Sequence, residues 1–248
     1  MLDALAFSSV WVAAGAGAAC AGAARALGVP VPVPAVLLAI GGTLAVYNVD
    51  RLRDLERDHG TSPLRSAFVL EHARGLRGLA LAGGTVAVVS ALLLGPRACA
   101  LSGAVLAVGL LHRRLKHVPL AKALYIAGAW TAVVAGVPML AGPEPRGASA
   151  GVVLALYLTL FANAVASSAR DGEGGPALIG IGRALVISRA CALAGFVLAL
   201  LLPEPGGRIV WISLLTFLAL STFRPTERHG LLVLDGALLV GGALAWLA

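Results

Sequence analysis

Long apolar stretches recur from one end of the chain to the other, separated by short breaks rich in Pro and Gly. A bilayer core about 30 Å thick is spanned by roughly 20 residues of α-helix. Nine segments fit this requirement, at residues 5–26, 32–49, 76–95, 98–112, 120–141, 150–168, 182–202, 208–223 and 230–247. The sequence therefore predicts an all-α integral membrane protein, with about nine transmembrane helices forming one bundle and a single domain over residues 1–248.

The charge content of the chain excludes a water-soluble fold. Charged residues make up 12% and hydrophobic residues 59% of the sequence, and the mean hydropathy is +0.91. A soluble domain carries about 25% charged residues, so lipid must replace water over most of this surface. The three cysteines, Cys20, Cys99 and Cys191, lie far apart in apolar stretches, a spacing that predicts neither a disulfide nor a metal site.

The basic residues are distributed unevenly between the two ends of the predicted helices. Fifteen of the 19 Lys and Arg residues follow even-numbered helices or begin the seventh, and four follow odd-numbered helices. By the positive-inside rule, the N-terminus and the even loops lie in the cytoplasm. The net charge of +7 is thus an orientation signal, and no nucleic-acid partner is expected. All five histidines share this side, so we expect the functional chemistry at the cytoplasmic face of a cell membrane, such as the inner membrane of a bacterium.

The densest polar segment is YNVDRLRDLERDHGTSPLR at residues 47–65, where the second predicted helix ends. Asp50, Asp54 and Asp58 are spaced by four residues, which places them on one face if the helix continues. Three carboxylates within about 12 Å repel one another unless cations lie between them. Oxygen ligands suit Mg²⁺ bound together with phosphate oxygens. The alternative is that the interleaved arginines neutralise a solvated helix face, which is the commoner role of such a pattern.

Two further polar segments lie on the same side. NAVASSARDGEGG at residues 163–175 ends the sixth predicted helix, carries Asp171 and is able to meet the first segment across the bundle; taken alone, it is favoured as a polar loop. HRRLKHVPLAK at residues 112–122 follows the fourth helix and carries Arg114 and Lys116. These basic residues serve as a positive-inside anchor, and they also offer a clamp for phosphate oxygens.

Together the three segments resemble the UbiA superfamily of intramembrane prenyltransferases, which has nine helices and a cytoplasmic N-terminus. The first Asp-rich motif of that family follows helix two and reads N-D-x-x-D-x-x-x-D, followed closely by P-x-R. It is similar to DRLRDLERD at residues 50–58 and to Pro63-Leu64-Arg65. In this comparison Asp50 stands in place of the Asn, and Arg51 stands in place of the first Asp.

The second motif of the family, D-x-x-x-D after helix six, is similar to the stretch that begins at Asp171. Gly175 stands in the second Asp position, and Glu173 lies between the two. The basic loop Arg114-Leu115-Lys116 is similar to the Lys-containing loop that the family has after helix four. In topology the resemblance covers nearly the whole chain.

The resemblance implies a Mg²⁺-dependent transferase, which passes the prenyl group of an isoprenyl diphosphate to a lipophilic acceptor within the membrane. The catalytic residues that it implies are Asp54, Asp58 and Asp171. The metal ligands that it implies are Asp50, Asp54, Asp58, Asp171 and Glu173. The residues that it implies for diphosphate binding are Arg65, Arg114, Lys116 and Arg170.

Alternatives stay open at this point. The same family includes terpene cyclases, in which the carbocation is captured by double bonds of its own chain. The departures at Arg51 and Gly175 also leave room for a non-catalytic membrane protein that binds a prenyl or lipid compound. Asp235, the acid inside the ninth predicted helix, is a functional candidate because intramembrane acids are costly. Transport is disfavoured because the second and sixth predicted helices carry no charge in mid-membrane.

Overall fold

The computed structural model describes residues 2–58, 60–111, 118, 120–142, 148–171 and 178–248, and within these ranges every regular element is helical. The elements before the midpoint of the chain are α1 (Leu2–Phe7), α2 (Val10–Ala26), α3 (Val33–Arg53), α4 (Leu55–Asp58), α5 (Pro63–Leu94) and α6 (Pro96–Leu111). The later α-helices are α7 (Ala121–Thr131), α8 (Val137–Ala141), α9 (Ser149–Asp171), α11 (Ile181–Leu201), α12 (Val210–Ser221) and α13 (Asp235–Leu247). Three short turns of other pitch are the π-helices η2 (Ala132–Gly136) and η4 (His229–Leu234) and the 3₁₀-helix η3 (Gly206–Ile209).

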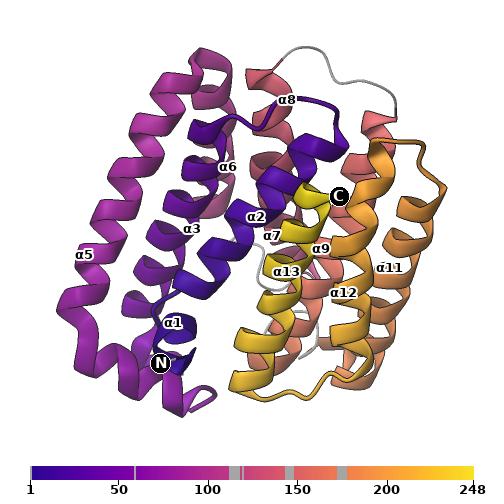
Figure 1. Cartoon of the computed structure of the whole chain (residues 1–248). Helices are drawn as coiled ribbons and strands as arrows, with labels where there is room; N and C mark the ends of the chain where they lie inside the picture. The colour runs from indigo at the N-terminus through magenta and orange to yellow at the C-terminus, as the bar shows by residue number, and fades with distance from the viewer. Residues whose placement is uncertain (1, 59, 112–117, 119, 143–147, 172–177) are drawn as a thin grey trace.

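The long helices run up and down in one bundle (Figure 1). By length and composition, six helical stretches of the described chain are able to cross a membrane: Val33–Arg53, Pro63–Leu94, Ala121–Ala141, Ser149–Asp171, Ile181–Leu201 and His229–Leu247. Val10–Ala26, Pro96–Gly109 and Gly206–Ser221 are apolar but shorter. The predicted all-α integral membrane class is confirmed, whereas nine crossings and a cytoplasmic N-terminus stay predictions.

The surface and the packing both fit a lipid environment. Large apolar side chains point outward, and Leu81 and Leu201 are each 75% exposed. Inside the bundle, α2 packs closely on α13 through glycines. A Cβ at Gly242 would lie 2.5 Å from backbone atoms of Ala18 and Ala19, and one at Gly22 would lie 2.8 Å from the Gly242 carbonyl oxygen. Small residues of this kind allow helix backbones to approach closely where lipid surrounds the bundle.

Two helix boundaries differ from the predicted ones. The segment 5–26 is interrupted at Ser9, whose φ of 65° is left-handed, and Asn48 stabilises this break by donating from Nδ2 to the Ser8 carbonyl at 3.1 Å. The helix predicted at 76–95 instead begins at Pro63, because the polar stretch before it is also helical, with a non-helical residue at His72. The predicted break at Gly95 is confirmed.

The polar segments gather at one end of the bundle, which we call the N-terminal end. Figure 1 shows α1, the end of α3 and the beginnings of α5 and α13 at this end, while the C-terminus lies at the other. The glycine contacts described above join α2 to α13, so the first and last long helices pack side by side. The N-terminal end therefore brings together segments from the whole length of the chain.

Candidate functional site

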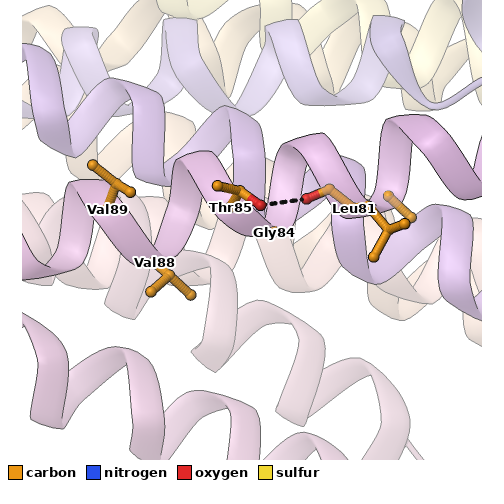
Figure 2. A pocket seen from close by; sticks show the side chains of 6 residues that line it. Leu81, Gly84, Thr85, Val88 and Val89 are labelled. Carbon is orange, nitrogen blue, oxygen red and sulfur yellow. Dashed lines mark hydrogen bonds between the residues drawn. The ribbon is translucent and has the colours of Figure 1, made fainter.

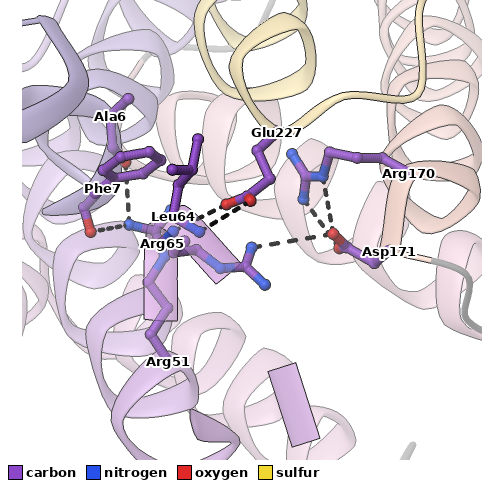
Figure 3. Close-up of polar contacts among 8 residues, drawn as sticks. All are labelled: Ala6, Phe7, Arg51, Leu64, Arg65, Arg170, Asp171 and Glu227. Carbon is purple, nitrogen blue, oxygen red and sulfur yellow. Dashed lines mark hydrogen bonds and ion pairs between the residues drawn. The ribbon is translucent and has the colours of Figure 1, made fainter. Parts of the chain in front are cut away.

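Three charged side chains from two helices meet at the N-terminal end. Asp171, the last residue of α9, accepts hydrogen bonds from its neighbour Arg170: Nε to Oδ1 at 2.8 Å and Nη2 to Oδ2 at 2.9 Å. Nη1 of Arg65, in the first turn of α5, lies 4.0 Å from Asp171 Oδ1 (Figure 3). The three side chains are only 8–18% exposed. The prediction that the first polar segment meets the 163–175 segment is confirmed through this pair, and we call these three residues the Arg–Asp cluster.

The position of Arg65 is set by a residue far away in the sequence. The carboxylate of Glu227, in the connection between α12 and η4, accepts the backbone N–H groups of Leu64 at 3.1 Å and Arg65 at 2.9 Å. These N–H groups belong to the first turn of α5, where no carbonyl of the same helix can accept from them. Pro63 in the same turn has no N–H group. Sequence reasoning missed Glu227, because no local pattern indicates which distant helix it caps.

The Arg51 side chain turns toward the N-terminal helix. It is 6% exposed, and its Nη1 donates to the carbonyl of Ala6 at 3.0 Å and to that of Phe7, at the end of α1 (Figure 3). No described hydrogen bond or ion pair joins it to Asp54. Arg51, which stands in the first Asp position of the family motif, therefore holds α1 against α3.

The first Asp segment does not continue as one helix, so the condition under which Asp50, Asp54 and Asp58 would share one face is not met. α3 ends at Arg53, Asp54 caps it with φ −95° and ψ 13°, and the four-residue α4 follows. The side chain of Asp50 is 57% exposed and forms an ion pair with Arg53 at 2.5 Å, whereas that of Asp54 is 14% exposed and lies 3.4 Å from Arg53 Nε.

Several of the predicted site residues lie outside the part that the structure describes. These are Arg114, Lys116, Glu173 and the side chain of Asp58. Lys122, in the first turn of α7, is the basic residue of the 112–122 segment that the structure describes. Of the predicted residues whose side chains are described, Arg65, Arg170 and Asp171 come together, while Asp50 lies in the last turn of α3 and Asp54 directly follows its end.

The described carboxylates fit a magnesium ion in their chemistry. Four lone-pair sites are available on the Asp171 carboxylate, and the hydrogen bonds from Arg170 use two of them. Asp54 offers a second, largely enclosed carboxylate. Mg²⁺ takes one or two carboxylates and completes its shell with water and phosphate oxygens. Within the described residues, no group of three His, Cys, Asp or Glu side chains forms a metal centre by itself.

A shallow groove on the outer face of α5 is a poor candidate. It has a volume of about 380 Å³ and is lined by Ala80, Leu81, Gly84, Thr85, Val88 and Val89 (Figure 2). Its one hydroxyl, Thr85 Oγ1, already donates to the Leu81 carbonyl at 3.0 Å. The groove lies on a strongly apolar helix and offers no charged group, so we place the candidate site at the Arg–Asp cluster.

The fold and the cluster define a polytopic membrane protein with enclosed charges at one end of a helical bundle. No family model and no curated protein matches the chain. Among solved structures, the apo structure of a UbiA homolog from Aeropyrum pernix K1 is similar, with a TM-score of 0.67 and 22% sequence identity over 92% of this chain and 96% of that one. The predicted resemblance to the UbiA superfamily is therefore confirmed in the fold.

Proposed function

We propose that this protein is a Mg²⁺-dependent intramembrane transferase that acts on an isoprenyl diphosphate and passes the prenyl group to a lipophilic acceptor. The observation that carries the proposal is the Arg–Asp cluster, which gathers two guanidinium groups and a carboxylate at the end of a UbiA-type bundle. A diphosphate needs cationic donors of this kind, and the fold offers an apolar interior for the prenyl chain.

The guanidinium groups of Arg65 and Arg170 bind the diphosphate oxygens in this proposal. Planar guanidinium groups form paired, charge-assisted hydrogen bonds with phosphate. The carboxylates of Asp54 and Asp171 hold Mg²⁺, together with Asp58. When bound, Mg²⁺ supplies positive charge that stabilises the diphosphate as it leaves, and stabilisation of this kind is usually the largest catalytic contribution.

The remaining residues of the proposal surround this centre. Asp50 and Glu173 are the additional metal ligands, and Arg114 and Lys116 add positive charge to the diphosphate site. The apolar bundle holds the prenyl chain and excludes water, which would otherwise capture the allylic carbocation before the acceptor does. Release of the proton from the acceptor completes the transfer.

Binding of labelled geranylgeranyl diphosphate to purified protein in detergent tests the proposal. We expect Mg²⁺-dependent binding that is lost in Asp54→Ala and Asp171→Ala. The matched control is Glu204→Ala, which removes an acid whose side chain is 74% exposed and paired with Arg208. Absence of binding by the wild-type protein, with and without Mg²⁺, contradicts the proposal and favours a non-catalytic lipid-binding protein.

A further inference from the structure

Asp235 is an enclosed acid that the proposed diphosphate chemistry does not use. It begins α13 directly after the π-helix η4, and it is only 8% exposed. Within the described chain, no side chain or backbone N–H donates a hydrogen bond to its carboxylate, and no ion pair within 4.0 Å includes it. An intramembrane carboxylate is costly and usually marks a functional position, and π-helices are frequent at such positions.

Asp235 lies deeper in the bundle than the Arg–Asp cluster. The neighbouring residue Leu234 accepts a hydrogen bond from Asn163 Nδ2 at 3.4 Å. Asn163 precedes Asp171 by eight residues on α9, which is about 12 Å along a helix axis. The end of η4 therefore lies about two turns of α9 further into the bundle than Asp171.

The surroundings of Asp235 combine aromatic and cationic groups. Trp11 of α2 lies beside this turn: its Nε1 donates to the Leu232 carbonyl at 3.2 Å and would lie 3.4 Å from a Cβ at Gly236. The described hydrogen bonds of Arg51 and Arg170 go to α1 carbonyls and to Asp171, so these cations are engaged elsewhere.

We propose that Asp235 is a second binding position in the membrane interior that accepts a hydrogen bond from the hydroxyl head of a neutral lipophilic ligand. A hydrocarbon chain offers no donor to a carboxylate, and a phosphate would be repelled by it, whereas a hydroxyl group satisfies it at little cost. The assignment of this ligand as the acceptor rests on the proposed transferase function, but its binding does not.

Quenching of tryptophan fluorescence by two brominated probes tests this position in the full-length protein in detergent. The probes are 2-bromododecan-1-ol and 2-bromododecane, which differ in the hydroxyl group alone. Because Trp11 Nε1 donates to the Leu232 carbonyl at 3.2 Å and would lie 3.4 Å from a Cβ at Gly236, a probe bound at Asp235 quenches Trp11, and the Trp11→Phe variant identifies that signal. We expect the alcohol to quench at a concentration at least about tenfold lower than the hydrocarbon, since each 1.4 kcal/mol of interaction is tenfold in affinity.

Variants of Asp235 separate this role from a purely electrostatic one. Asp235→Leu removes the acceptor at similar volume and should abolish the preference for the alcohol, while Asp235→Asn keeps a carbonyl acceptor and should restore part of it. Asp3→Leu, which removes an acid that is 41% exposed and paired with Arg228 at 2.9 Å, is the matched control. A folded Asp235→Leu protein that keeps the preference overturns the proposal. Equal quenching of the wild type by both probes also overturns it, without any need for a variant.

Parallel binding of labelled geranylgeranyl diphosphate distinguishes this inference from the proposed function. A protein that prefers the alcohol but binds no isoprenyl diphosphate keeps the Asp235 site and loses the transferase assignment. Diphosphate binding without a preference for the alcohol keeps the transferase assignment and overturns the Asp235 site.

Discussion

Arg65 and Asp171 face each other at 4.0 Å although 105 residues of chain lie between them. The contact joins the beginning of α5 to the end of α9, and Arg170 completes it from the same helix. Two guanidinium groups thus meet one enclosed carboxylate. This relationship is the reason that we propose a diphosphate as the ligand at this end of the bundle.

Replacement of Arg65 by Ala should weaken the binding of geranylgeranyl diphosphate by about tenfold or more. Hydrogen bonds to charged groups contribute about 1.5–3 kcal/mol, and each 1.4 kcal/mol is tenfold in affinity. Equilibrium binding of the labelled ligand in detergent measures the change. Arg97→Ala, at an exposed position where α6 begins, serves as the control, and equal affinities of the two variants would argue against a phosphate role for Arg65.

Replacement of Gly230 by Ala should disturb Arg170 without removing a charge. The added Cβ would lie 2.7 Å from Cδ and Nη1 of Arg170, so the guanidinium group must move away from Asp171. We expect weaker diphosphate binding and a nearly unchanged melting temperature, because the end of a flexible side chain yields more easily than backbone. Gly78→Ala, which meets no heavy atom within 4 Å, should bind normally, and wild-type affinity in Gly230→Ala contradicts the prediction.

Replacement of Glu227 by Ala should loosen the first turn of α5. The backbone N–H groups of Leu64 and Arg65 lose their acceptor, and loss of a helix cap costs about 0.5–2 kcal/mol. Amide hydrogen exchange of residues 63–67 should become faster. Glu71→Ala removes an acid whose side chain is 77% exposed on the same helix, and it should leave this exchange unchanged. Identical protection in both variants would mean that Glu227 does not order this turn.

Replacement of Arg51 by Ala should release α1 while leaving the diphosphate site intact. The carbonyl groups of Ala6 and Phe7 lose their donor, so hydrogen exchange of residues 2–9 should accelerate. The affinity for the diphosphate should stay within about threefold of the wild-type value, a change of about 0.6 kcal/mol. A large gain in Mg²⁺-dependent affinity would instead show that Arg51 opposes metal binding at the first Asp segment.

Replacement of Gly242 by Ala should destabilise the whole bundle. The added Cβ would lie 2.5 Å from the backbone of Ala18 and Ala19, so α2 and α13 must separate. Overpacking of this kind costs about 1–3 kcal/mol and should lower the melting temperature in detergent. The control is Gly42→Ala, whose Cβ meets no heavy atom within 4 Å. Equal melting temperatures would show that the α2–α13 contact adapts freely.

Local features of the sequence predicted the ends of a helix well where a Gly or Pro residue, or the thickness of the bilayer, sets those ends. The break at Gly95 falls where expected, because Gly and Pro act on the backbone of their own neighbourhood. The extra helical turns from Pro63 were missed, since charged residues there are compatible with a helix that leaves the membrane. The break at Ser9 was also missed, because it depends on a contact with Asn48 across the bundle.

The sequence by itself determined the membrane class and the gathering of polar residues on one side, because these follow from the apolar composition of the long segments and from local charge. Only the tertiary structure decided that Arg51 turns to α1, that Glu227 caps α5 and that Arg65 meets Asp171. These contacts join residues that are 45, 162 and 106 positions apart. The direction of a long side chain depends on which distant partner satisfies its hydrogen bonds, and the packing of the helices sets that choice.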